Sequence, residues 1–430
     1  MSEPAPVIDL AEARDAEEKR GVLKGIDAQL QKNKDGLVLG TISNLILIIG
    51  QDPVLAGLCG FDDFECAAVL HSSPPPVLDG TEPIPGPYPR PWIGSDVSHI
   101  LSYIQRVWTR LAKIGEVEHA MGAVAAVRRF HPVRDWLATL AWDGVPRVDT
   151  WLVHAFGAVE TSYTAAVGSK ILIAALRRVR RPGCKFDHMM ILEGPQGIGK
   201  SKAISALFSE IWTTDSLLAE LNSRDGALGL LGIWLIEFAE IEQIIRTEVE
   251  VIKGFLSRSV DRYRSPYGRG FLKHPRQCVF IGTTNDDDYL RDSTGNRRFW
   301  PIRCQFADVE WVMANRDQLW AEAAAREAAG EDHWLSDPET NTTATKVQAA
   351  RVQEDVWADR VLNMLGLRTA ITIPEVLSDI LAIPVERQGK REQMRVAAIL
   401  RTAGWKRETK WDGGKAAKRW LVREPGGGKE

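Results

Sequence analysis

One eight-residue segment has the residue types and spacing of a phosphate-binding loop. Residues 194–201 read GPQGIGKS and satisfy the pattern G-x-x-x-x-G-K-[ST]. Glycines let backbone N–H groups surround phosphate, the lysine reaches the β- and γ-phosphates, and the serine hydroxyl binds Mg²⁺. An apolar run precedes the loop and KSKAISALF follows with helical spacing, which is the required strand–loop–helix order. The predicted nucleotide contacts are Gly194, Pro195, Gln196, Gly197, Ile198, Gly199, Lys200 and Ser201, with Ser201 also on Mg²⁺.

Carboxylates end a second apolar run. Residues 232–243 read GIWLIEFAEIEQ, so the run leads into Glu237, Glu240 and Glu242. A phosphate-binding loop needs acids at the end of a neighbouring strand, where they bind Mg²⁺ and orient the attacking water. We assign Glu237 to Mg²⁺ coordination and Glu240 to the general base or to water positioning. Because these two acids are three residues apart rather than adjacent, the alternative that one of them only caps the following helix stays open.

An amide and two arginines follow further along the chain. In CVFIGTTNDDDYL, residues 278–290, Asn285 ends an apolar run and can polarise water against the γ-phosphate. We interpret the three aspartates after it as a solvated loop rather than as a two-metal site. In DSTGNRRFWPI, residues 292–302, Arg297 and Arg298 lie between a turn and an apolar run. An arginine placed there can reach the γ-phosphate bound by a neighbouring subunit.

The chain resembles the virulence-associated E family of phage and mobile-element proteins. The resemblance lies in the order and spacing of GPQGIGKS, WLIEFAEIE, YRSPYGRG, CVFIGTTN and TGNRRFWPI. The segment HPVRDWLATLAWDGVPRVDTWL, residues 131–152, also resembles the part of the family that precedes its ATPase core. The family belongs with the superfamily 3 helicases, a branch of the AAA+ ATPases. The match covers roughly residues 95–306 and, more loosely, the C-terminal part of the chain.

This resemblance implies an ATP- and Mg²⁺-dependent helicase or replication initiator that forms a ring, with six subunits expected. ATP sites would be shared between subunits, and the partners would be single-stranded and forked DNA. The family's Walker A, Walker B, sensor and arginine-finger roles map to Lys200/Ser201, Glu237/Glu240, Asn285 and Arg297/Arg298. Many relatives carry a primase–polymerase domain upstream. This chain has about 95 residues there without a catalytic carboxylate cluster, so a separate primase is the expected partner.

A basic segment lies between the acidic run and the Asn285 run. Residues 251–276 contain seven Lys or Arg residues and one acid, Asp261. The central SPYGRG has turn chemistry and predicts a β-hairpin. In superfamily 3 helicases a hairpin in this position tracks single-stranded DNA in the ring channel. The expected DNA contacts are Arg269, Lys273 and His274, with Tyr267 stacking on a base; the alternative is that some of these arginines pair with carboxylates of the adjacent subunit.

The C-terminal part is a second basic region. Residues 385–423 contain twelve Lys or Arg residues and four acids. The pattern predicts a helix, a short strand, two helices and a hairpin around Asp412-Gly413-Gly414, as in a winged helix. The expected buried stripe of its cationic helix is Val396, Ile399 and Leu400. Lys390, Arg391 and Arg395 would face a DNA duplex, although winged helices also bind proteins.

These motifs require an α/β protein with several parts. Short apolar runs alternate with helical stretches between about residues 165 and 306, which favours a sheet covered on both faces. We predict an AAA+ or superfamily 3 P-loop core over 161–330, after a polar tail or helix over 1–35 and a mostly helical accessory or oligomerisation region over 36–160. The latter includes a proline-rich loop over 72–91. A winged-helix-like domain is predicted over 347–425.

Composition is typical of a globular protein, with 44% hydrophobic and 26% charged residues and a net charge of −3. No apolar run approaches the roughly 20 residues that cross a bilayer, and the acidic N-terminus lacks the pattern of an export signal. The five cysteines are scattered without zinc spacing. We therefore expect a cytoplasmic protein with reduced thiols and no membrane partner.

Three functions remain open from the sequence. The leading one is an ATP-dependent DNA helicase or replication initiator that translocates on single-stranded DNA. A second is a DNA-binding or interference protein in which ATP only switches the conformation and no strands are separated. A third is a DNA-packaging or general P-loop ATPase, which the lack of a recognisable nuclease domain disfavours. The basic hairpin and the arginine pair favour the first.

Overall fold

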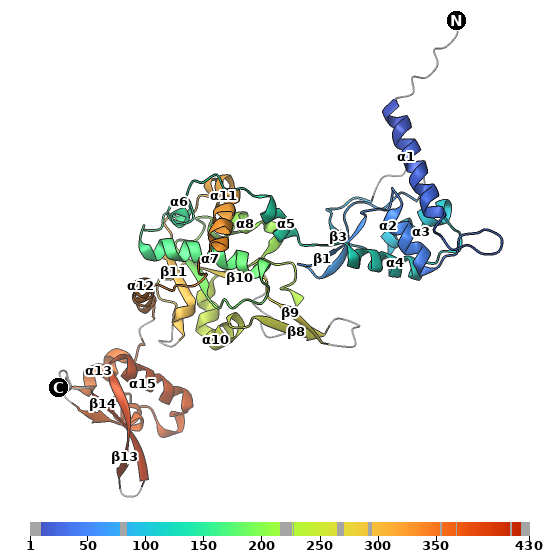
Figure 1. Cartoon of the computed structure of the whole chain (residues 1–430). Helices are drawn as coiled ribbons and strands as arrows, with labels where there is room; N and C mark the ends of the chain where they lie inside the picture. Colours follow the sequence, from blue (N-terminus) through green and yellow to red (C-terminus); the bar gives the residue numbers. More distant parts are fainter. Residues whose placement is uncertain are drawn as a thin grey trace. The chain divides into compact units, whose positions relative to one another are not determined.

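The computed structural model describes residues 10–77, 84–215, 226, 228–264, 271–290, 295–352, 355–366, 368–412 and 415–422. The chain divides into two compact units, residues 1–139 and residues 140–430, which are described separately (Figure 1). In the described part of the chain, no helix combines the length and the apolar character that a bilayer-spanning segment needs.

The N-terminal unit combines helices with a four-stranded sheet. Strand β1 pairs antiparallel with β2 and parallel with β4, in the order β3-β2-β1-β4. The core packs helices α2, α3 and α4 together through fully buried side chains such as Ile48, Ile100 and Met121. The elements are α1 (Leu10–Asp27), α2 (Ile42–Gln51), β1 (Cys59–Asp62), β2 (Ala67–Leu70), β3 (Arg90–Pro91), α3 (Gly94–Val107), α4 (Ile114–Val127), β4 (Arg129–Phe130) and α5 (Pro132–Thr139).

The sequence did not reveal this sheet, which lies in a region whose regular structure is otherwise helical. Its strands are only two to four residues long, which is too short for an alternating pattern to stand out in the sequence. The boundary also differs from the predicted one at residue 160, because the N-terminal unit ends at Thr139.

The second unit contains a five-stranded parallel sheet in the order β11-β5-β10-β7-β6. Met189, Phe238 and Phe280 lie on one face and pack against α10, whose Ile245 and Phe255 are buried there. Helix α11 packs against both α7 and α8. The elements are α6 (Trp151–Phe156), α7 (Ser162–Arg180), β5 (Met189–Glu193), α8 (Lys200–Phe208), η1 (Glu210–Trp212), β6 (Thr213–Thr214), β7 (Leu235–Phe238), α10 (Ile241–Leu256), β8 (Val260–Arg264), β9 (Phe271–Pro275), β10 (Val279–Thr284), η3 (Asn296–Arg298), β11 (Phe299–Arg303), α11 (Val309–Ala328) and α12 (Pro338–Ala349).

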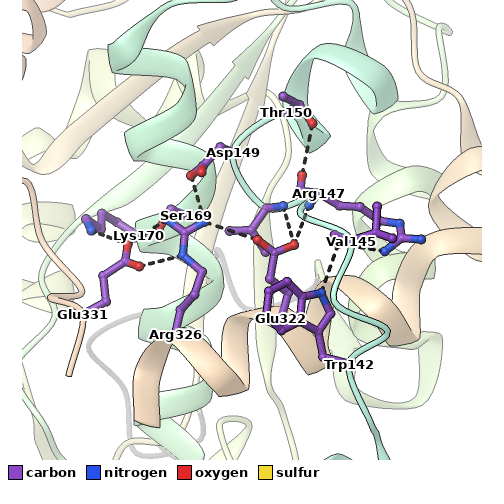
Figure 2. Close-up of polar contacts among 11 residues, drawn as sticks. Trp142, Val145, Arg147, Asp149, Thr150, Ser169, Lys170, Glu322, Arg326 and Glu331 are labelled. Atoms are coloured by element: carbon purple, nitrogen blue, oxygen red, sulfur yellow. Dashed lines mark hydrogen bonds and ion pairs between the residues drawn. The ribbon is translucent and has the colours of Figure 1, made fainter. Parts of the chain in front are cut away.

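Polar contacts attach residues 140–160 to this unit (Figure 2). The buried Glu322 of α11 accepts hydrogen bonds from the backbone N–H groups of Arg147 and Val148. Arg326 donates to Asp149 at 2.9 Å and to Glu331 at 2.6 Å. The contacts of Glu322 with Arg147 and Val148, and of Arg326 with Asp149, join residues more than 170 positions apart. The local pattern that suggested a boundary at residue 160 could not reveal them.

The same unit also extends past the predicted end at residue 330. Helix α12 packs on β11, and Gln348 Nε2 donates to the backbone oxygen of Phe299 at 2.8 Å. Two residues after α12, Arg351 forms an ion pair with Glu193 at the end of β5. The start predicted for the last domain, residue 347, therefore lies inside the part of the chain that packs on the sheet.

The C-terminal part has the predicted order of helix, strand, two helices and hairpin. Its strands form a sheet in the order β12-β14-β13, and its core contains Val361, Leu377, Val396 and Leu400. The elements are α13 (Ala358–Leu365), β12 (Ala370–Ile371), α14 (Ile373–Glu375), η4 (Val376–Ile380), η5 (Val385–Arg387), α15 (Lys390–Thr402), β13 (Trp405–Asp412) and β14 (Lys415–Val422).

Candidate nucleotide-binding site

The glycine-rich loop joins the end of β5 to the start of α8, as the sequence predicts. Gly199 has φ +95° and immediately precedes Lys200, the first residue of α8. A Cβ at Gly194 would lie 2.5 Å from the backbone oxygen of Cys304. Glycine is therefore required at position 199 by backbone conformation and at position 194 by the close approach of another segment.

A pocket of about 420 Å³ lies over this loop. Its walls come from the segments that follow β5, β7, β10 and β11, whose carboxyl ends meet at one edge of the parallel sheet. Strands β5 and β10 are neighbours in the sheet, but the chain continues from β5 to β6 on one side and from β10 to β11 on the other. Open α/β sheets bind ligands at the point where the strand order reverses in this way. The lining residues are Gln196, Gly197, Ile198, Gly199, Lys200, Ser201, Lys202, Ala239, Glu240, Thr283, Thr284, Asn285, Ala307 and Val309.

The side chain of Lys200 contacts the backbone of the glycine-rich loop. Its side-chain Nζ donates to the backbone oxygens of Gly194 at 2.7 Å and Pro195 at 2.9 Å. The residue is buried, and burial lowers the pKa of its ammonium group. The lysine therefore lies where the motif requires a cation, within the loop rather than in solvent.

Glu237 lies behind the loop and is buried at the end of β7. Its Oε1 accepts hydrogen bonds from Ser201 Oγ at 2.6 Å and from Thr283 Oγ1 at 3.0 Å. Mg²⁺ prefers oxygen ligands of this kind, a carboxylate beside hydroxyl groups. The donor set at this position therefore fits Mg²⁺. Thr283 was not among the predicted site residues. Its position at the end of an apolar run is the feature of the sequence that could have indicated it.

Glu240 and Asn285 are exposed and line the same pocket. Glu240 has φ 47° and ψ 47°, a left-handed conformation that is uncommon for a residue other than glycine. It is the residue before α10, yet its carboxylate makes no capping bond to that helix. Glu240 therefore occupies the N-cap position of α10 without a capping bond from its side chain. Strained residues of this kind cluster at functional sites.

The aspartates after Asn285 form an exposed loop, as interpreted from the sequence. Asp287 and Asp288 are exposed, and Asp287 pairs with Arg303 at 3.2 Å. Within the described ranges, no group of three or more candidate metal ligands is found.

The arginine pair lies at the opposite edge of the sheet from the pocket. Arg297 and Arg298 belong to η3, immediately before Phe299, which pairs with Met189 at the amino end of β5. The glycine-rich loop begins at the carboxyl end of β5, five residues after Met189. At about 3.3 Å per residue, the distance along the strand from Met189 to the loop is about 16 Å. Arg297 is exposed, whereas Arg298 Nε lies 3.5 Å from Oδ2 of Asp187. The structure therefore does not bring the pair to its own chain's pocket.

The predicted hairpin is present as the antiparallel pair β8–β9, in which Arg262 lies opposite Lys273. Lys273 is exposed, and burial lowers the pKa of the half-buried His274. Tyr267 and Arg269 lie outside the described residues. Arg276 has a structural role, because it is buried and forms an ion pair with Asp261. Strand β9 leads into the amino end of β10, so the hairpin begins at the edge that also carries the arginine pair.

Lys273→Ala is expected to weaken binding of single-stranded DNA. The exposed ammonium would neutralise one phosphate per subunit, so the slope of log Kd against log salt should fall by about 0.7 per bound subunit. Fluorescence anisotropy of a labelled oligonucleotide over a salt series measures both quantities. Lys34→Ala, which removes an exposed charge from the N-terminal unit, is the control. Unchanged affinity and slope in Lys273→Ala would exclude a phosphate contact at this position.

In the C-terminal part, Lys390 and Arg391 are exposed at the start of α15, and Val396, Ile399 and Leu400 are buried as predicted. Arg395 differs from the prediction because it is only partly exposed. Its guanidinium donates to both carboxylate oxygens of Asp355, at 2.6 and 2.8 Å. It also lies 3.8 Å from the centre of the Trp357 ring. Arg395 is thus engaged within this part, whereas Lys390 and Arg391 remain exposed.

The fold and the site together define an α/β protein with a glycine-rich loop, a cation and carboxylates at one edge of a parallel sheet. The chain belongs to the virulence-associated protein E-like domain family, whose model matches residues 137–353, just over half of its length. This finding confirms the family resemblance seen in the sequence motifs.

No curated protein sequence matches the chain. Among solved structures, the apo structure of the NrS-1 C-terminal region is similar at 12% identity and a TM-score of 0.45, covering 85% of this chain and 95% of that chain. An A-form apo structure of the same region has 12% identity and a TM-score of 0.43, with 85% and 96% covered.

Proposed function

We propose that this protein is a Mg²⁺-dependent ATPase of the superfamily 3, AAA+ type that acts on DNA as a helicase or replication initiator of a phage, prophage or mobile element. One observation carries the proposal: Lys200, the Ser201–Glu237 pair, Glu240 and Asn285 come from three separate segments and meet around one pocket. Family membership supports the assignment to phage or mobile-element replication.

The residues around the pocket suit phosphoryl transfer to water. Lys200 and the loop N–H groups would bind the β- and γ-phosphates, while Ser201 and Glu237 would hold Mg²⁺. The metal ion would neutralise charge that develops on the phosphate oxygens. Glu240 would orient the attacking water and accept its proton, because its exposed carboxylate lies on the pocket wall. Asn285, also on that wall, would hydrogen-bond the water or the γ-phosphate.

A ring of identical subunits would give the arginine pair a role despite its distance from the pocket of its own chain. Arg297 and Arg298 lie at the far edge of the sheet from their own pocket. In a head-to-tail ring, one face of each subunit contacts a different face of the next. The arginines of one subunit can then complete the pocket of its neighbour, and the β8–β9 hairpins can contact single-stranded DNA in the channel.

Unwinding of a labelled DNA fork, with the native mass measured on the same sample, tests the proposal. We expect strand separation that needs both ATP and Mg²⁺, in an assembly with the mass of six subunits. ATP hydrolysis that ignores DNA, without strand separation, would instead favour the ATP-switched DNA-binding protein. Absence of nucleotide binding would contradict both functions.

A further inference from the structure

One wall of the nucleotide pocket has no part in the phosphate chemistry proposed above. In the strand order β11-β5-β10-β7-β6, the loop after β5 lies between two sides of the pocket. Glu240 and Asn285 follow β7 and β10 on one side, whereas Ala307 and Val309 follow β11 on the other. Because the γ-phosphate is expected beside Glu240 and Asn285, the ribose and the base are expected on the side of Val309.

The side chain of Val309 lies close to the glycine-rich loop. A Cβ at Gly199 would be 3.8 Å from Val309 Cγ2 and 3.7 Å from the Cβ of Ala307. Gly199 immediately precedes Lys200, the cation expected to bind the β- and γ-phosphates. Val309 is therefore adjacent to the place where the phosphates are expected to end.

Helices α8 and α11 leave the pocket side by side. Helix α8 begins with Lys200 and α11 with Val309, and both residues line the pocket. Further along, Trp320 Nε1 of α11 donates to the backbone oxygen of Leu207 in α8 at 2.9 Å. The two helices therefore run in the same direction, and their first turns form the side of the pocket that remains for the ribose and the base.

An exposed methionine continues the wall that Val309 begins. Met313 comes four residues after Val309 in α11, so the two side chains share one face of the helix. Long side chains in helices lean toward the preceding turn, which directs Met313 toward Val309 and the pocket. Met313 is 66% exposed, so its thioether is accessible to a ligand that extends from the pocket along α11.

We propose that Val309 and Met313 form a platform for the purine base of a nucleoside triphosphate, and that this platform accepts adenine and guanine alike. The inference rests on the proposed function for the position of the phosphates. Methionine sulfur makes favourable contacts with aromatic rings, and every base has an aromatic face. Since a valine has no hydrogen-bonding group and a thioether is only a weak acceptor, the platform does not distinguish the amino group of adenine from the oxo group of guanine.

The polar groups on this side of the pocket suit both purines as well. Lys202, exposed in the first turn of α8, lines the pocket. Its ammonium can donate to N7, an acceptor that adenine and guanine share. Among the described lining residues that follow β11, Ala307 and Val309, neither has a side-chain acceptor for the amino group of adenine. Strong discrimination requires a site built to hydrogen-bond the group that differs, so we expect little preference between the two purines.

Titration calorimetry of the full chain with Mg²⁺ tests the platform with three probes: ADP, GDP and inorganic triphosphate, which has no base. ADP and GDP should bind within about tenfold of each other. Met313→Ala should weaken the binding of both by about two- to tenfold, the range of a sulfur–aromatic contact, and leave the Kd of inorganic triphosphate unchanged. Met313→Leu, which keeps a large apolar side chain, should retain most of the affinity for ADP and GDP.

Met364→Ala is the matched control, because Met364 is also exposed on a helix, at 58%, but belongs to α13. It should change none of the three dissociation constants. Unchanged binding of ADP and GDP by Met313→Ala would overturn the inference, as would an equal loss for inorganic triphosphate, which would place the effect at the loop. A preference above about 100-fold for one purine would overturn it by revealing a polar contact that reads the base. A wild type that binds none of the three probes would refute the proposed function itself.

Discussion

Lys200→Ala is expected to lower kcat for ATP hydrolysis by about 10²–10³-fold, the usual cost of removing one group that stabilises transition-state charge. Lys200 Nζ lies within the loop, 2.7 Å from the Gly194 oxygen and 2.9 Å from the Pro195 oxygen. No other segment that lines the pocket is expected to supply a cation to the same phosphates. Steady-state phosphate release measures the effect.

Lys346→Ala, an exposed lysine of α12 in the same unit, is the control for loss of one positive charge and should hydrolyse ATP like the wild type. Thermal unfolding without nucleotide should show that Lys200→Ala remains folded. Turnover near the wild-type rate in folded Lys200→Ala would exclude the loop as the catalytic phosphate site.

Substitution of the acting arginine, Arg297 or Arg298, by alanine is expected to lower kcat by about 10³–10⁵-fold, the effect of losing an arginine finger. The two are changed separately, because Arg297 is exposed whereas Arg298 lies next to Asp187. Their place at the amino edge of the sheet prevents either from reaching its own pocket. The loss should therefore arise at a subunit interface.

Mixing supplies the test of that geometry. Lys200→Ala subunits keep the arginines, and the arginine variant keeps the loop, so some interfaces of a mixed ring are complete. At equal proportions, random assembly makes about a quarter of the interfaces complete. ATP hydrolysis should therefore reappear when two inactive proteins are combined. If mixed assemblies form and no mixing ratio restores turnover, the arginine does not act between subunits.

Much of the candidate nucleotide site could be predicted from the sequence because its parts are local. The glycine-rich loop, Lys200 and Ser201 are consecutive in the chain, and Glu237 and Asn285 each mark the end of an apolar run. Such runs become parallel strands, whose carboxyl ends meet at one edge. The hairpin could be predicted for the same reason, since SPYGRG lies between two strands that pair with each other.

Contacts between distant segments could not be predicted in this way. The parallel β1–β4 pair, the attachment of residues 140–160 through Glu322 and the Arg351–Glu193 pair all join positions far apart in the chain. Arg395 shows the same limit within one domain, because its partner Asp355 lies 40 residues earlier. A charge pattern along one helix reveals a cationic residue but not the carboxylate that neutralises it.

The sequence by itself determined the residue types of the candidate phosphate-binding loop, because such a loop consists of eight adjacent residues whose types are dictated by backbone conformation and charge. Only the tertiary structure decided which edge of the sheet each group occupies. Strand order and direction place Lys200, Glu237 and Asn285 at the carboxyl edge and Arg297 and Arg298 at the amino edge. The physical reason is that strand pairing depends on long-range hydrogen bonds and burial, which no local pattern of residues contains.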